Sequence, residues 1–102
     1  MVRKIDFEEA GRILAQEKNA VLLEVREEAE YITGHAVDAL LLPVDELTGA
    51  RAAALLPDRD APILVYCRSG RRSRTAVALL ESFGYTRLYD LGSLIGWPYG
   101  LE

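Results

Sequence analysis

The sequence predicts an α/β domain whose parallel sheet is covered by helices on both faces. Two observations carry this prediction. Four short runs have the composition of buried strands, and segments with helical spacing or turn residues separate them. The chain has 102 residues, 50% of them hydrophobic, which is enough for one domain to bury a core without disulfides or metal.

The N-terminal third begins with a predicted helix. Apolar residues repeat with helical spacing over 7–17, and Asp6 and Glu9 before them resemble a capping box. Residues 21–25 are mostly apolar and β-branched at both ends, which predicts a strand buried on both faces. The acidic run that follows suits the first turn of a short helix, and Gly34 behind it ends that helix.

The middle of the chain contains two further strand signals. Residues 39–42 predict a second buried strand, which Pro43 ends. Residues 45–56 suit one or two short helices. The strongest strand signal in the chain is the apolar run over 62–66.

A polar turn over 67–72 leads from this strand into a helix. Apolar residues at helical spacing over 76–83 mark one face of that helix, and Gly84 ends it. Residues 87–91 predict the last strand, and 92–100 are too rich in glycine and proline for more than one helical turn.

Composition excludes several classes of protein. One cysteine and one histidine allow no disulfide within the chain and too few ligands for a structural zinc site, so we expect no metal and no cofactor. The longest apolar stretch, 39–44, is too short to span a membrane. An acidic residue at position 6 leaves no room for a signal peptide, which predicts the cytoplasm, where a thiol stays reduced.

The charge is unevenly distributed. The formal net charge is −4, yet four of the twelve basic residues, all arginines, lie within seven positions directly after Cys67. Without them, 8 basic residues remain against 16 acidic ones, a balance of −8. The cluster is short and has no interleaved aromatic residues, which disfavours nucleic-acid binding and indicates a local positive field beside the thiol.

Cys67 is the candidate nucleophile. Ligands of open parallel sheets bind beyond the carboxyl ends of the strands, where this residue falls. The start of a helix points backbone N–H groups at one spot, and these groups and nearby cations lower a cysteine pKa. The alternative is a small buried hydrophobic residue beside solvated arginines. A position between a buried strand and an arginine-rich turn favours the reactive thiol.

An ordered set of motifs resembles the rhodanese-like family, in its single-domain sulfurtransferase form, from about residue 5 to residue 99. The matching segments are Leu22–Glu27, Tyr31, Gly34–His35, Leu42–Leu47, Val65–Ser73, Gly84–Tyr85, Leu91–Gly92 and Trp97–Pro98.

This resemblance implies a three-layer fold with a five-stranded parallel sheet flanked by helices on both faces. It also implies a persulfide mechanism, in which Cys67 takes a sulfane sulfur from a small anionic donor such as thiosulfate. The acceptor would be cyanide, a thiol or a protein. The loop that would cradle the persulfide with its backbone N–H groups comprises Arg68, Ser69, Gly70, Arg71 and Arg72, with Ser73 opening the helix behind.

We assign residues 1–100 to one rhodanese-like domain. The last two residues, Leu101 and Glu102, are given no role, since they can be the remnant of an expression vector. The residues leave the oligomeric state and the physiological donor and acceptor open.

Two positions depart from the family pattern. Glu24 stands two residues before Arg26 where the family usually has aspartate, and we interpret it as a structural carboxylate. Gly92 is followed by Ser93 where the family usually has a second glycine, which suggests the loss of an easy positive-φ position.

Other polar and aromatic residues receive structural interpretations. His35 belongs to a Gly-His turn, and a thiolate formed by its surroundings needs no partner base. Trp97 and Tyr99 are expected to close the core, and Tyr66 is expected to pack in its strand.

Two alternative functions remain. Phosphatase and arsenate-reductase relatives have a loop of cysteine, five residues and arginine, whereas here the sixth residue after Cys67 is Ser73 and Arg72 comes one place early. A shorter loop suits one sulfur atom better than a tetrahedral phosphate. The other alternative is a non-catalytic rhodanese-like module that binds partners or only carries sulfur.

Overall fold

A single five-stranded sheet organises the molecule, which the computed structural model describes over residues 1–102. The strand order is β1-β5-β4-β2-β3, and every neighbouring pair is parallel. The strands are β1 (Val2–Lys4), β2 (Val21–Glu24), β3 (Leu40–Leu41), β4 (Ile63–Cys67) and β5 (Leu88–Ser93).

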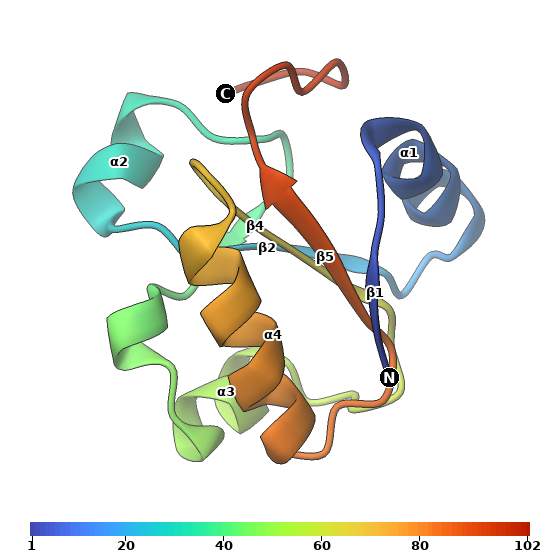
Figure 1. Cartoon of the computed structure of the whole chain (residues 1–102), viewed down its shortest axis with the longest axis vertical. Helices are drawn as coiled ribbons and strands as arrows, with labels where there is room; N and C mark the ends of the chain where they lie inside the picture. The colour runs from blue at the N-terminus through green and yellow to red at the C-terminus, as the bar shows by residue number, and fades with distance from the viewer.

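Helices connect the strands and form the outer layers, as Figure 1 shows. The helices are α1 (Phe7–Gln16), α2 (Glu28–Thr33), the 3₁₀ turn η1 (Val44–Glu46), α3 (Gly49–Leu55) and α4 (Arg71–Ser82). The five-stranded parallel sheet with helices on both faces confirms the fold class that the resemblance implied.

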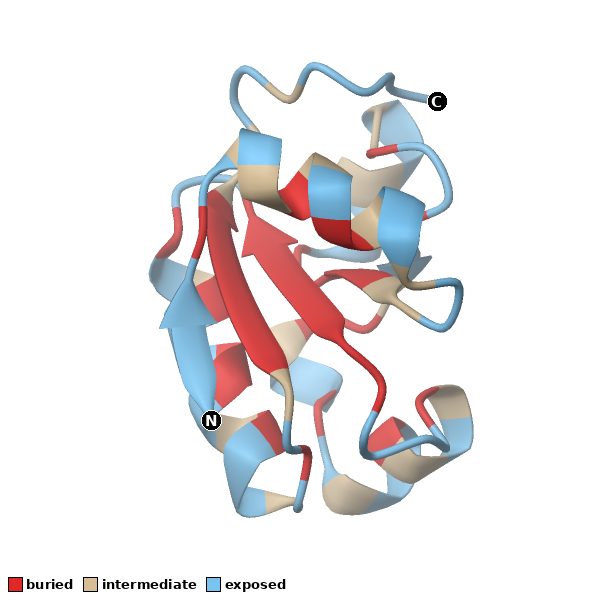
Figure 2. Cartoon of the chain, turned by 90° about the vertical axis from the view of Figure 1, so that its right-hand side faces the viewer, coloured by how far each residue is buried: buried red, intermediate tan, exposed pale blue.

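Each face of the sheet has its own hydrophobic cluster, which fixes the two outer layers. One cluster packs α3 and α4 against the sheet and includes Leu23, Val65 and Leu80. The other packs α1 against the opposite face and includes Ile13 and Leu64. The central strands β4 and β5 are therefore buried, whereas β1 is exposed, as the burial colours in Figure 2 show.

The sheet edges differ from the expectation. The N-terminal strand β1 was not predicted, because three residues with exposed side chains carry no apolar pattern; it pairs with β5 from Val2 opposite Leu88. The strand expected to be buried over 39–42 is only two residues long, and it pairs with β2 alone. Leu40 is 37% exposed, because β3 lies at the free edge of the sheet.

The remaining elements lie close to their predicted bounds. Asp6 caps α1 by accepting a hydrogen bond from the Glu9 N–H (2.8 Å), but the reciprocal half of the capping box is absent, since Glu9 binds Arg3 instead. The last strand extends two residues further than expected, to Ser93. No helical turn forms over 94–100.

Candidate active site around Cys67

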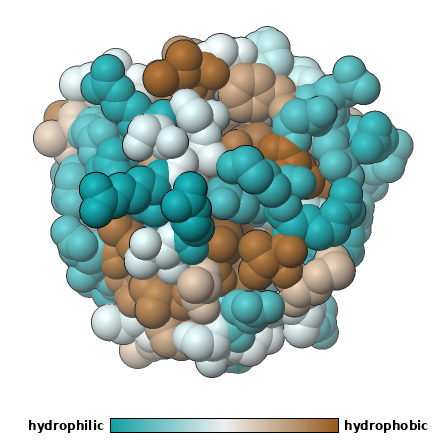
Figure 3. Space-filling view, in the orientation of Figure 1, coloured by the Kyte–Doolittle hydropathy of each residue, from teal (hydrophilic) through white to brown (hydrophobic).

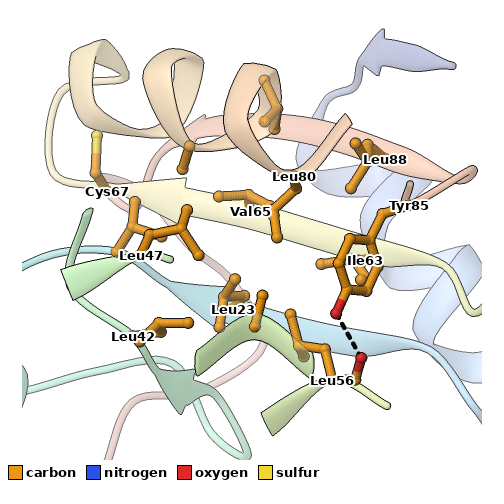
Figure 4. Packing of buried hydrophobic residues seen from close by; sticks show 14 residues of the cluster. Leu23, Leu42, Leu47, Leu56, Ile63, Val65, Cys67, Leu80, Tyr85 and Leu88 are labelled. Carbon is orange, nitrogen blue, oxygen red and sulfur yellow. Dashed lines mark hydrogen bonds between the residues drawn. The ribbon is translucent and has the colours of Figure 1, made fainter. Parts of the chain in front are cut away.

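Cys67 is the last residue of β4, and its side chain is completely buried. In Figure 4 its sulfur points away from the strand toward the first turn of α4. The Cys67 side chain is part of the apolar cluster on the α4 face of the sheet, and Leu47 lies beside it in the same view. The thiol therefore lies at the carboxyl edge of the sheet, at the junction that the sequence predicted.

The loop after Cys67 turns back so that its backbone N–H groups approach the sulfur. Gly70 has a φ of +97°, and its N–H donates to the Cys67 Sγ over 2.9 Å. A side chain at this position would be strained, because only glycine adopts this region freely. Because Gly70 has no side chain, the loop can reverse its direction here and the helix can start immediately afterwards.

Burial and hydrogen bonding act on the thiol in opposite directions. Burial raises the pKa of Cys67, but hydrogen bonds from the backbone N–H groups of Ser73, Gly70, Ser69 and Arg72 lower it. The net effect is a pKa below the ordinary cysteine value, so the thiolate is favoured. The structure agrees with the predicted direction, and the backbone N–H groups at the start of α4, one of the two predicted causes, account for it.

Ser73 fixes the first turn of α4 in front of the sulfur. Its hydroxyl oxygen lies 2.8 Å from Asp90 Oδ1 and 3.0 Å from the Gly70 carbonyl oxygen, and all three groups are buried. Asp90 comes from β5, so the helix start is tied to the neighbouring strand. A Cβ on Gly70 would come within 3.6 Å of the Gly92 Cα, which shows how closely the loop packs on β5.

Arg72 forms an ion pair that the sequence did not predict. Its guanidinium binds Glu30 of α2 with both terminal nitrogens, at 2.5 and 3.0 Å. Arg72 in turn holds the pKa of the Glu30 carboxyl at about 2. A carboxylate of the chain itself therefore occupies the Arg72 side chain, which leaves it less available to an anionic substrate.

The other arginines of the cluster remain in solvent. Arg68 and Arg71 are exposed, as is Ser69 between them.

Ser93 ties the end of β5 to the cysteine loop. Its hydroxyl donates a 2.5 Å hydrogen bond to the Arg68 carbonyl oxygen and accepts one from the Ile95 N–H at 3.0 Å. Ser93 has a negative φ, so the expected loss of a positive-φ position does not occur.

A buried polar network lies one residue behind the cysteine. The Tyr66 hydroxyl donates to Glu24, and the Arg26 Nε donates to the same carboxylate over 2.6 Å. The Tyr66 oxygen also accepts the Ala36 N–H, and the Arg26 Nη2 donates to the Gly34 carbonyl oxygen. Tyr66 was interpreted as packing alone; it also holds the 34–36 turn against β2 and β4. Burial raises its pKa, and the bond to Glu24 raises it further.

His35 makes its contacts away from the cysteine loop. Its Nδ1 lies 2.8 Å from the Tyr31 carbonyl oxygen and its ring stacks on the Tyr31 ring. The chain end packs here too, because the backbones of His35 and Glu102 exchange two hydrogen bonds. Residues 101–102, which received no role, thus pair with the 35–37 segment.

Of the two C-terminal aromatic residues, Trp97 closes the α1 side of the core as expected, whereas Tyr99 lies outside it and is 48% exposed. Trp97 packs edge to face against Phe7, with ring centroids 5.4 Å apart, and Tyr99 packs edge to face against Trp97. A Cβ on Gly11 would clash with the Tyr99 ring, which lies directly against α1.

The molecule has neither a metal-binding cluster of side chains nor a membrane-spanning helix. No group of three or more histidine, cysteine, aspartate or glutamate side chains is arranged to hold a metal ion. None of the helices combines the length and the apolar character that crossing a membrane requires.

Comparison with known proteins identifies the family of the chain. The family described as rhodanese-like domain matches residues 6–97. A protein named sulfurtransferase from Allochromatium vinosum is 40% identical over 98 residues, covering 95% of this chain and 89% of that protein. The thiosulfate sulfurtransferase PspE of Escherichia coli is 33% identical over 72 residues, covering 71% of this chain and 68% of PspE.

Solved structures show the same fold. The rhodanese-like domain of the Anabaena protein Alr3790 has a TM-score of 0.86 at 27% identity, covering all of this chain and 80% of that one. An Escherichia coli rhodanese with anions has a TM-score of 0.75 at 29% identity, covering 81% of this chain and 96% of that one. With the family match spanning most of its length, the chain belongs to the rhodanese-like domain family, in its single-domain sulfurtransferase form.

Proposed function

We propose that the protein transfers a sulfane sulfur through a persulfide on Cys67 to an external thiophilic acceptor. The donor is thiosulfate, a polysulfide or a persulfide, and the acceptor is a thiol or cyanide. The observation that carries this proposal is the buried Cys67 sulfur at the start of α4, with the Gly70 N–H 2.9 Å away and further backbone N–H groups lowering its pKa. The name of the PspE relative supports thiosulfate as a donor.

The first half-reaction is a nucleophilic displacement. The Cys67 thiolate attacks the outer sulfur of thiosulfate, the S–S bond of thiosulfate breaks, and sulfite leaves with the bonding electrons. The product is a persulfide whose terminal sulfur carries the negative charge. Backbone N–H groups preorganised around a sulfur anion stabilise the thiolate before the step and the persulfide after it.

The second half-reaction needs another molecule. Cys67 is the only cysteine of the chain, so no internal thiol can displace the terminal sulfur. An external thiolate or cyanide attacks that sulfur, the S–S bond of the persulfide breaks, and the Cys67 thiolate is regenerated. No electrons are gained or lost overall, so the two half-reactions need no external oxidant or reductant.

Steady-state turnover tests the proposal. Thiosulfate and cyanide should yield thiocyanate with the wild type and none with Cys67→Ser, whose thermal unfolding would show that it still folds. Hydrolysis of an aryl phosphate, measured in parallel, should be absent. Phosphate hydrolysis without thiocyanate formation, or equal thiocyanate formation by Cys67→Ser, would refute the proposal. Loading of sulfur without turnover would indicate a sulfur carrier instead.

A further inference from the structure

Most arginines in this molecule have partners. The chain has ten, and six of them bind carboxylates. These six are Arg3, Arg12, Arg26, Arg51, Arg72 and Arg87. Arg59 donates to the Phe83 carbonyl oxygen. The other three, Arg68, Arg71 and Arg74, are exposed and form neither an ion pair nor a side-chain hydrogen bond.

The three unpartnered arginines gather at one place, beside Cys67. Arg68 follows the cysteine directly, Arg71 begins α4, and Arg74 lies three residues further along the helix. Residues three apart share a helix face, so Arg71 and Arg74 project together. In Figure 3 hydrophilic side chains gather over the N-terminal end of α4, with apolar side chains below them over α3. Unpaired like charges held close together favour an anionic ligand.

The extent of this cluster exceeds what one sulfur atom requires. The Arg74 Cα lies about 4.5 Å beyond that of Arg71 along the helix axis, away from the sulfur. Small molecules bind in concave sites that bury most of their surface. The two hollows of the surface lie elsewhere, one between β3 and α3 around Leu41 and Leu55, the other around Phe7 and Leu91. Neither is lined by Arg68, Arg71 or Arg74. A cationic surface without a hollow of its own suits a macromolecule better than a small molecule.

We propose that Arg68, Arg71 and Arg74 form a docking surface for an acidic protein segment that carries the acceptor thiol. This inference rests on the proposed function and specifies its acceptor. Cys67 has no exposed surface, and a persulfide extends only about 2 Å beyond its Sγ. The acceptor cysteine must therefore come close to the loop on a narrow segment, and the arginines hold the acidic residues around it.

The transfer step is balanced. The acceptor thiolate attacks the terminal sulfur of the Cys67 persulfide, a new S–S bond forms on the acceptor, and the old S–S bond breaks. The electron pair of the broken bond returns to Cys67 as its thiolate. The acceptor leaves as a persulfide anion, so the charge of the complex is unchanged and no oxidant is consumed.

Three cysteine peptides that differ only at their charged positions test the proposal. These positions are glutamate in one peptide, serine in the second and lysine in the third, and glutathione and β-mercaptoethanol serve as small thiols. We expect the persulfidated wild type to transfer sulfur fastest to the glutamate peptide. Added salt should reduce this preference. Arg74→Glu should lower the ratio of glutamate-peptide to serine-peptide rates by about threefold to tenfold.

Arg12→Glu is the matched control, because it makes the same charge change on α1, on the other side of the sheet. It should leave the rate ratio at the wild-type value. Equal rates with all three peptides, or equal losses in Arg74→Glu and Arg12→Glu, would overturn the proposal. A further result would also overturn it. If sulfur transfer to glutathione exceeded transfer to β-mercaptoethanol by the same factor as transfer to the glutamate peptide exceeds transfer to the serine peptide, the surface would be selecting a small anion.

Direct binding separates this inference from the proposed function. A glutamate peptide with serine in place of cysteine cannot accept sulfur, so its fluorescence anisotropy on the unloaded protein reports docking alone. We expect weaker binding to Arg74→Glu than to Arg12→Glu. Binding that is identical in the two variants refutes the docking surface even if sulfur is transferred. A difference between them supports the surface even if no persulfide forms.

Discussion

Replacing Gly70 by alanine would show whether the backbone of the loop sets the reactivity of Cys67. Gly70 has a φ of +97° and donates its N–H to the Cys67 sulfur over 2.9 Å. An added Cβ meets nothing closer than the Gly92 Cα, at 3.6 Å, so the substitution causes no clash. Its cost is conformational, because an L-residue in the left-handed region is disfavoured by about 1–2 kcal/mol.

The loop can relieve this strain by rotating the peptide, and the N–H then leaves the sulfur. A hydrogen bond to a charged acceptor contributes about 1.5–3 kcal/mol. At 1.36 kcal/mol per pKa unit, its loss raises the thiol pKa by about 1–2 units. The Gly70→Ala variant should therefore have a less acidic thiol and a lower alkylation rate at neutral pH.

Gly84→Ala supplies the matched control. Gly84 follows the other end of α4 with nearly the same φ, +96°, and a Cβ there meets only the Arg59 side chain, at 3.5 Å. Both variants should lose similar free energy of unfolding in urea. The iodoacetamide rate, followed against pH, should shift its midpoint upward only in Gly70→Ala. An unchanged midpoint in Gly70→Ala, with the expected loss of stability, would refute the role given to the loop backbone.

Three further substitutions test the surroundings of the loop. Ser73→Ala leaves the buried Asp90 carboxylate without its hydroxyl partner and should cost about 1–3 kcal/mol in urea unfolding; a loss below about 0.5 kcal/mol would contradict this. Arg72 lowers the pKa of Glu30 to about 2. The ion pair therefore contributes fully to the free energy of unfolding above the ordinary glutamate pKa of about 4.3, and this contribution is lost as the pH falls toward 2. Glu30→Gln should cost about 1 kcal/mol at neutral pH, since both side chains are partly exposed, and should flatten the acid dependence of the urea midpoint; an unaltered acid dependence would exclude the pair. Tyr66→Phe removes the hydroxyl that donates to Glu24 and accepts from the Ala36 N–H, and should lower the free energy of unfolding by about 2 kcal/mol. An unchanged free energy of unfolding would mean that this network does not contribute to stability.

The sequence allowed the central elements to be predicted because their signals are local. The apolar run over 62–66 and the glycine-containing turn after it place Cys67 between a buried strand and a helix, whatever the rest of the chain does. The structure has this arrangement, with β4 ending at Cys67 and α4 beginning at Arg71. The edge strands lack such signals, since β1 is exposed and β3 has two residues, and only pairing with β5 and β2 defines them.

The support of the site depends on contacts between residues distant in sequence, which no local pattern contains. Arg72 and Glu30 are 42 residues apart, and Ser73 and Asp90 are 17 apart. A charged residue inside a predicted strand was the available signal for Asp90, since a buried carboxylate needs a partner. The structural interpretation of Glu24 came from its place in the family pattern, but its partner Tyr66 emerges only from the pairing of β2 with β4.

Intact-mass spectrometry after treatment with thiosulfate tests the central claim most directly. The wild type should gain the mass of one sulfur atom and lose it again when a thiol acceptor is added, because the persulfide on Cys67 is the intermediate of the transfer. Cys67→Ser should gain nothing. No gain on the wild type, or an equal gain on Cys67→Ser, would contradict the account.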